Sequence, residues 1–301
     1  MAAMRRTKAS YTADAACAAR AHGALHADAR LRNPDHLAGR IVGMPFRIML
    51  WPVLRRRFLQ EYERRGPGVY FHHQARTKRF DALWVEELTA GTRQFVVLGA
   101  GFDTRAYRFT ERPEGMQIFE VDHPLTGAEK QRRVRQVLRR KAPNVTYVSV
   151  DFAKDDLAER LEESGFDPEQ RSFFLWEGVT PYHTAAEVDA TLAFVAKMAD
   201  GSSIAFDYVY RSALEAPSAD AKKQFDLARA AGEPYDFGID PADLGPLLAR
   251  HALVLDSNLE PDEIIQRYLV GSDGRVWGKP PPFMGIAHAR VIRPPTPPQW
   301  P

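Results

Sequence analysis

The stretch Gln94-Phe-Val-Val-Leu-Gly-Ala-Gly-Phe-Asp-Thr-Arg105 decides the fold. Residues 95–98 form an apolar run typical of a buried strand, and this run ends abruptly at Gly99-Ala100-Gly101. A doubly wound α/β fold begins a nucleotide site with such a strand and glycine turn. Glycine accepts a positive φ, and without a Cβ it lets the backbone approach a ligand closely. The stretch therefore predicts a parallel α/β sheet with a nucleotide-like ligand at this turn.

The next predicted strand, residues 117–121, helps to choose between two cofactors. It ends at Asp122, 23 positions after Gly99, where an acidic residue holds the hydroxyls of a ribose. A dinucleotide fingerprint needs a glycine at the position of Thr104. Asp103 would repel a pyrophosphate at the following helix N-terminus, but it suits the cationic amine of S-adenosylmethionine (SAM). The turn therefore favours SAM over NAD, although Asp103 also suits a helix cap.

Carboxylates recur where the predicted strands end. They are Asp103, Asp122, Asp151 and Glu177. Ligands of open α/β sheets bind outside the carboxyl ends of the strands, so we expect these residues in one site. None has a His or Cys partner at metal-ligand spacing, and we predict no metal. Tyr182 and His183 follow Glu177 and are candidates for substrate contact, whereas no catalytic base is evident.

Strand and helix patterns alternate after residue 94, which is typical of a parallel sheet with crossover helices. Further strands are expected at 145–150, 172–176, 203–206, 251–255 and 285–292, with a helix at 124–141. We expect residues 1–90 to form a helical cap, with helices at 10–33, 47–65 and 70–90. Residues 91–301 then form the main domain, with a helical lid insertion at about 211–250.

Composition narrows the class of protein. Hydrophobic residues make up 45% of the 301 residues, enough for a large core, and the single Cys17 excludes an internal disulfide. No apolar run approaches the ~18 residues of a membrane span. The basic start is not followed by the apolar segment of a signal peptide. We therefore expect a cytoplasmic protein with no membrane association.

Charge is distributed unevenly along the chain. The net charge is +2, yet residues 1–80 contain sixteen Lys and Arg against five Asp and Glu. A basic cap over an acidic body would attract an anionic small-molecule substrate. Solvated helix faces explain the same excess. No zinc-finger spacing or RNA-binding aromatic motif accompanies it, so no nucleic-acid partner is expected, and the sequence leaves the oligomeric state open.

Four motifs together resemble the leucine carboxyl methyltransferase superfamily, in its bacterial, actinobacterial-type branch of SAM-dependent O-methyltransferases. They are Leu98-Gly-Ala-Gly-Phe-Asp-Thr-Arg105, Glu120-Val-Asp-His-Pro124, Val150-Asp-Phe152 and Glu177-Gly-Val-Thr-Pro-Tyr182. The stretch Arg76-Thr-Lys-Arg-Phe-Asp81 resembles a further family motif. The resemblance implies a class I, Rossmann-like fold of seven strands, with the last strand antiparallel beside the fifth.

The resemblance also implies roles for individual residues. Arg76 would hold the SAM carboxylate, and the turn Gly99-Ala100-Gly101 would approach the methionine part. Asp122 would bind the ribose. Asp151 and Phe152 would frame the adenine, and Glu177 would lie near the SAM amine.

These expectations point to methyl transfer onto a small-molecule oxygen. A carboxylate is already ionised at neutral pH, whereas a phenol would gain from a general base. Since no base is evident, a carboxylate acceptor is favoured over a phenol or hydroxyl. An NAD-dependent oxidoreductase, disfavoured by Asp103 and Thr104, and a non-catalytic SAM- or nucleic-acid-binding module are the alternatives.

Overall fold

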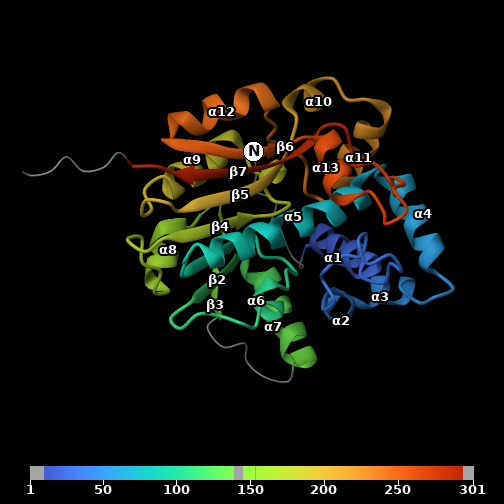
Figure 1. The fold of residues 1–301 in the computed structure, drawn as a ribbon, viewed down its shortest axis with the longest axis horizontal. Helices are drawn as coiled ribbons and strands as arrows, with labels where there is room; N and C mark the ends of the chain where they lie inside the picture. Colours follow the sequence, from blue (N-terminus) through green and yellow to red (C-terminus); the bar gives the residue numbers. More distant parts are fainter. Residues whose placement is uncertain (1–9, 139–144, 153, 294–301) are drawn as a thin grey trace, which may run out of the picture.

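A computed structural model describes residues 10–138, 145–152 and 154–293. Its centre is a seven-stranded sheet in the order β3-β2-β1-β4-β5-β7-β6 (Figure 1). The strands are β1 (Gln94–Leu98), β2 (Gln117–Asp122), β3 (Val145–Ser149), β4 (Ser172–Trp176), β5 (Ser203–Val209), β6 (Leu253–Leu259) and β7 (Met284–Val291). Strands β1 to β5 pair in parallel, and β7 runs antiparallel between β5 and β6. The predicted sheet, with its last strand antiparallel beside the fifth, is confirmed.

Helices connect the strands and form the N-terminal part. They are α1 (Tyr11–Gly23), α2 (Ala38–Ile41), α3 (Met44–Met49), α4 (Arg55–Arg65), α5 (Val69–Thr89), α6 (Arg105–Arg108), α7 (Pro124–Leu138), α8 (Leu157–Glu163), α9 (Ala185–Val195), α10 (Arg211–Glu215), α11 (Ala219–Ala230), α12 (Pro241–Arg250) and α13 (Pro261–Tyr268), with a 3₁₀ turn η1 (Thr180–Tyr182). In Figure 1 the cap helices α1 to α4 lie together beside one end of the sheet.

Both faces of β1 are buried, which explains its continuous apolar sequence. Phe95 and Val97 belong to a core cluster that includes Trp84 of α5, and the Trp84 and Phe95 ring centroids lie 4.4 Å apart. Val96 and Leu98 belong to a second cluster on the opposite face, with residues of α9 and α12. The sheet is thus covered on both sides, and ligands reach it at the strand ends.

Two of the three predicted N-terminal helices are wrong in extent. The helix expected at 10–33 ends at Gly23, whose carbonyl accepts hydrogen bonds from the amides of His26 and Asn33 as the chain turns back. The helix expected at 47–65 is divided into α3 and α4. The break contains Pro52. Proline lacks a backbone N–H and disfavours helical backbone in the residue before it, so the helix does not continue through this position. The third helix, expected at 70–90, is confirmed as α5.

Later boundaries differ less. The described part of the helix expected at 124–141 is α7, and residues 139–141 lie outside the described residues. The sixth strand begins at Leu253 rather than 251 because Ala252, with φ of 55°, turns the chain between α12 and β6. A capping box of Thr184 and Glu187 begins α9. Within the expected lid segment, α12 packs against β6 and the core, and α11 lies nearer the cap.

Candidate functional site

One cavity of about 1460 Å³ lies at the carboxyl edge of the parallel strands, between the sheet, the cap helices and the segment after α11. All the site residues predicted from the sequence line it: Arg76, Gly99, Ala100, Gly101, Asp103, Asp122, Asp151, Phe152, Glu177, Tyr182 and His183. Their convergence follows from topology, because parallel strands end at the same edge of a sheet.

The glycine turn after β1 is built so that a side chain does not fit. Gly99 and Gly101 have φ of 62° and 44°, in the left-handed region that favours glycine. A Cβ on Gly99 would also lie 2.5 Å from Cγ2 of Val179. The turn therefore presents bare backbone to the cavity.

Asp122, at the end of β2, is joined to this turn. One carboxylate oxygen accepts a hydrogen bond from the amide of Gly101 at 2.5 Å, and the other accepts from the amide of His123 at 2.7 Å. Asp122 is buried and lines the cavity. The acidic residue of the nucleotide motif thus fixes the turn as well as facing the ligand space.

Arg76 of α5 lies between two carboxylates, that of Glu177 directly after β4 and that of Asp207 in the second half of β5. Its Nε donates to Glu177 at 3.0 Å, and its Nη1 donates to Asp207 at 2.6 Å. Asp207 also accepts from the amide of Gly178 at 2.6 Å. Burial raises the pKa of Asp207, but the charge of Arg76 and the contact with His72 outweigh burial and leave this pKa well below its usual range. Arg76 is therefore held as a cation on the cavity wall.

A second arginine supports the same wall. Arg105 donates to Glu177 at 2.6 Å, to Asp81 at 2.7 Å and, through Nη1, to Asp103. The other oxygen of Asp103 accepts from the amide of Arg105 at 2.7 Å, but the N-cap of the short helix α6 is Thr104, so the cap role expected for Asp103 is wrong. Burial raises the pKa of Asp103, yet the charges of Arg105, Lys130 and Arg20 lower it to about 2. Asp103 is thus a carboxylate at neutral pH.

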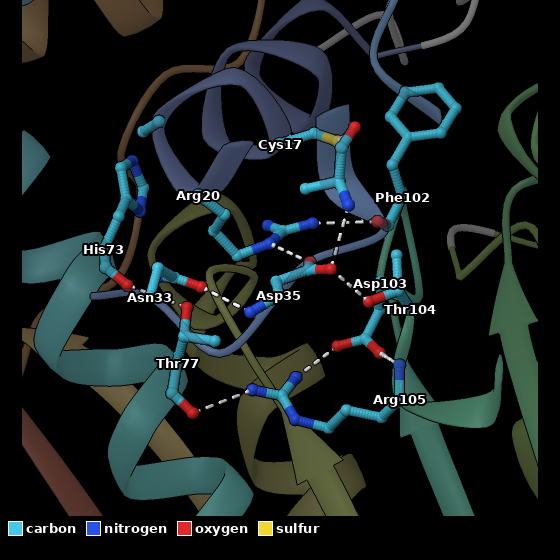
Figure 2. Close-up of polar contacts among 12 residues, drawn as sticks. Cys17, Arg20, Asn33, Asp35, His73, Thr77, Phe102, Asp103, Thr104 and Arg105 are labelled. Atoms are coloured by element: carbon cyan, nitrogen blue, oxygen red, sulfur yellow. Dashed lines mark hydrogen bonds and ion pairs between the residues drawn. The ribbon is translucent and has the colours of Figure 1, made fainter. Parts of the chain in front are cut away.

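A third arginine ties the cap to the glycine turn (Figure 2). Arg20 of α1 donates to Asp35 at 2.9 Å and to the carbonyl of Phe102 at 2.8 Å. Asp35 also accepts from the hydroxyl of Thr104 at 2.6 Å. All of these side chains are buried. The cap is therefore attached to the residues after the turn by a buried polar network rather than by apolar contact alone.

Asp151 and Phe152 form the side of the cavity near β3. Asp151 pairs with Lys154, and its amide donates to Asp155 at 2.8 Å. The ring of Phe152 lies 5.1 Å, edge to face, from that of His183. His183 also contacts Glu187, with 3.4 Å between Nδ1 and Oε2. Phe152, predicted on the cofactor side, and His183, predicted on the substrate side, are thus neighbours in the cavity wall.

The remaining wall comes from the cap, from α11 and the segment after it, and from the start of β7, and it combines apolar and aromatic residues. Its members include Phe46, Met49, Phe58, Tyr62, Leu227, Tyr235 and Met284. The Tyr182 and Tyr235 rings lie 5.2 Å apart, edge to face. Burial, followed by the neighbouring Tyr235, raises the pKa of Tyr182 well above its ordinary value, so its hydroxyl stays protonated.

Sequence reasoning missed three residues of this site. Asp207 ends the predicted fifth strand and repeats the strand-end carboxylate pattern, which was the available signal. His73 lies one helical turn before Arg76 and shares its face of α5, and this i, i+3 spacing was the available signal. Tyr235 comes from the loop after α11, where periodicity carries no information.

Within residues 10–138, 145–152 and 154–293, no three or more His, Cys, Asp or Glu side chains are grouped as a metal site would need. No helix in this part of the chain has the length and apolar character to cross a membrane.

The sheet order, the antiparallel last strand and the strand-end cavity define a class I methyltransferase fold. Solved structures share it: a DUF574 family protein from Streptomyces avermitilis has a TM-score of 0.57, with 17% identity over 84% of this chain and 97% of that one. A protein from Thermobifida fusca titled "putative methyltransferase" has a TM-score of 0.54, with 15% identity over 80% and 89%. Residues 16–196 match the family model of the leucine carboxyl methyltransferases, and the chain belongs to that family.

Curated relatives agree with the family. The "Putative S-adenosyl-L-methionine-dependent methyltransferase YktD" of Bacillus subtilis is 30% identical over 193 residues, which are 63% of each chain. A protein of the same description from Saccharopolyspora erythraea is 40% identical over 147 residues, 46% of this chain and 49% of its own. The matches thus span less than two thirds of these relatives. Both relatives are described as SAM-dependent, which confirms the prediction that the cofactor is SAM.

Proposed function

We propose that this protein transfers a methyl group from SAM to an oxygen of a small molecule, and that this oxygen belongs to a carboxylate. The observation that carries the proposal is the pair formed by Arg76 and Glu177, 3.0 Å apart on the wall next to the glycine turn. A cation beside an anion complements the carboxylate and the ammonium group of an amino acid. The methionine end of SAM carries both groups.

The rest of the strand-end wall fits the nucleoside end. The turn at Gly99 and Gly101 offers unobstructed backbone, and Asp122 faces the same space as an acceptor for ribose hydroxyls. Phe152 supplies an aromatic face for a purine. When bound there, SAM would supply a methyl group on a cationic sulfur. These residues would hold it, and the cap would exclude water from it.

The acceptor is assigned to the wall formed by the cap and the segment after α11. A carboxylate acceptor is ionised at neutral pH, so positioning is the main requirement, and orientation alone contributes ~7–11 kcal/mol to such reactions. Tyr182 keeps its proton because burial raises its pKa, and it suits hydrogen bonding to an anionic acceptor rather than proton removal. The basic cap favours an anionic substrate.

A phenol or hydroxyl acceptor is the second candidate, and His73 favours it. This side chain lines the cavity one turn from Arg76. Burial, with the charge of Arg76, lowers its pKa well below the ordinary value, so the imidazole is neutral at pH 7. A neutral imidazole has an acceptor nitrogen that suits a hydrogen bond from a phenol hydroxyl, and such a bond would position the phenol oxygen.

Mass spectrometry of products from SAM and a panel of small acids and phenols tests the proposal. A methyl ester releases methanol in mild alkali, whereas an aryl methyl ether does not. With a carboxylate acceptor, kcat/KM stays flat from about pH 6 upward in both the native protein and His73→Gln. An alkali-stable product, formed with a kcat/KM that rises with pH above 7, would establish the phenol reaction. Calorimetry in which NAD but not SAM binds would refute both.

A further inference from the structure

The segment from α3 to the start of α4 carries an unusual exposed apolar surface. Among the large apolar side chains of the described residues, the three most exposed are Val53 at 85%, Met44 at 64% and Trp51 at 63%. Ile48 of α3 adds a fourth exposed side chain. These four residues, here called the apolar tip, lie within ten consecutive positions. Such clustering on a surface marks an interaction site more often than scattered single residues do.

The apolar tip is held in place by a buried base. Leu50 and Phe58, which flank the turn, are buried against the cap. Nε of Arg55 donates to the carbonyl of Leu50 at 3.0 Å and closes the turn. In Figure 1, α3 and α4 lie at the outer edge of the cap, away from the strands. The tip is therefore a presented surface and not a core segment left without packing.

Positive charge surrounds the apolar tip. Residues 36–60 contain five arginines and no Asp or Glu. Arg47, Arg56 and Arg57 are exposed, and within the described part of the chain none of these three forms an ion pair. Arg64 and Arg65, further along α4, are instead paired with Glu61. The unpaired arginines therefore leave a basic rim around the tip.

We propose that the apolar tip and its basic rim bind an anionic membrane surface. Tryptophan is favoured at membrane interfaces, apolar side chains gain by entering the acyl boundary, and arginines bind anionic headgroups. The apolar tip with its basic rim matches the surface of an anionic membrane, where negative headgroups lie above an apolar acyl layer. This differs from the expectation of no membrane association, which rested on the absence of a spanning segment. Surface binding needs no span.

The inner side of the same segment connects this surface to the cavity. Pro45, Phe46 and Met49 line the cavity, while Met44, Ile48 and Trp51 face outward. An acceptor dissolved in the bilayer would thus meet an apolar route to the cavity. This part of the inference rests on the proposed function, and it indicates an amphipathic acid as the acceptor.

Flotation of the full chain with vesicles tests membrane binding without any assay of activity. The vesicles contain phosphatidylcholine alone or with one third phosphatidylglycerol. We expect binding to the anionic vesicles that weakens at high salt. The double variant Arg56→Gln/Arg57→Gln should bind roughly 25-fold more weakly, at about five-fold per arginine. Trp51→Ser/Val53→Ser should also lose binding.

Matched controls use exposed residues elsewhere. Val254→Ser/Ile292→Ser removes apolar side chains of 47% and 52% exposure, and Arg250→Gln/Arg267→Gln removes two exposed arginines. Both controls should bind vesicles as the native chain does. Urea unfolding, without lipid, checks that each variant is folded, and calorimetric titration with SAM tests the proposed function. The titration also separates failure of the proposed function from failure of this inference.

Three outcomes would overturn the inference. They are no binding of the native chain to anionic vesicles, equal losses of vesicle binding in the control variants and the tip variants, or tip variants that bind vesicles as the native chain does. Self-association that Trp51→Ser/Val53→Ser abolishes, without vesicle binding, would show that a second copy of the chain covers the tip.

Discussion

The carboxylate of Asp122 and the amide of Gly101 are 2.5 Å apart, so the end of β2 and the turn after β1 behave as one unit. Asp122 consequently has two tasks, since it fixes the backbone of the turn and faces the ligand space. The same carboxylate performs both tasks, so a substitution removes both at once. Substitutions at this residue should therefore affect ligand binding more than a single lost contact would.

Asp122→Ala should weaken SAM binding by roughly 10- to 150-fold or more. A hydrogen bond to a charged group is worth ~1.5–3 kcal/mol, and release of Gly101 adds to that loss. Isothermal titration with SAM measures the effect. Asp226→Ala, which removes an exposed carboxylate from α11, is the control and should leave the affinity unchanged. Equal affinities in folded Asp122→Ala and native protein would remove Asp122 from the site.

Arg76→Ala should lose more affinity for SAM than for 5′-methylthioadenosine, which lacks the amino acid carboxylate. Arg76→Lys should recover part of the loss, because lysine keeps the charge but not the planar fork. The ratio of the two dissociation constants is the measurement that matters. Removal of Arg76 also leaves the buried Asp207 without its guanidinium partner, which lowers stability by ~3–5 kcal/mol, whereas Glu177 keeps its contact with Arg105.

Arg79→Ala, one turn further along α5, is the matched control for Arg76. Its guanidinium bonds to Ser257 and Glu86 and does not line the cavity. It should bind both ligands as the native protein does. Equal losses for both ligands in Arg76→Ala would make Arg76 a structural residue of the cap and sheet.

Gly99→Ala should lower both the free energy of unfolding and the SAM affinity. The new Cβ would lie 2.5 Å from Val179 Cγ2, and a φ of 62° costs a non-glycine residue ~1–3 kcal/mol. Adding Val179→Ala should relieve the clash but not the backbone strain, so recovery should be partial. In α7, Gly127→Ala meets no atom within 4 Å and should instead stabilise by ~0.5–1 kcal/mol. Urea titration compares them.

Acid should destabilise the protein through Asp103. Its pKa is about 2 in the folded protein and about 4 in an unfolded chain. The folded state therefore binds fewer protons between these values. The stabilisation is complete above pH 4 to 5 and is lost as the pH falls towards 2. The contribution is on the order of 2 kcal/mol.

Urea unfolding at pH 7, 5, 4 and 3 checks this dependence. Asp103→Asn should be less stable than the native protein at pH 7, yet it should lose less stability on acidification. Asp226→Asn, at the surface, should follow the native curve. A native curve and an Asp103→Asn curve that fall in parallel would assign acid sensitivity to other carboxylates, of which Asp207 is the first candidate.

The sequence predicted the sheet well because its strands are short apolar runs that end in glycine or a carboxylate. The run at 95–98 and Asp122 were sufficient to place the turn and its partner strand. The N-terminal helices were predicted less well. The helix expected at 10–33 ends instead at Gly23, where the side chain of Gln74 of α5 occupies the space that a Cβ would need. That contact joins residues 51 positions apart, and local pattern does not contain it.

The candidate site was predictable where it follows strand ends and unpredictable where it depends on the cap. The sequence identified the residues around the turn, and all of them line the cavity. Their pairing did not follow from sequence: Arg105 joins Asp103, Glu177 and Asp81 from three elements. Tyr235 reaches the cavity from the loop after α11, and neither spacing nor residue type in a loop predicts that a side chain will line a cavity.

The place of β7 has a consequence for how the chain acquires its native state during synthesis. β6 contacts the sheet only through β7, which is the last of the described strands to leave the ribosome. Until then β5 has an open edge, although Asp207, opposite Ile286 in that ladder, belongs to the cavity wall. The nascent protein should therefore remain incomplete at its ligand end until β7 has been synthesised and has paired with β5. A ribosome stalled before residue 284 should hold a chain that captures no SAM, even with every predicted cofactor residue already made.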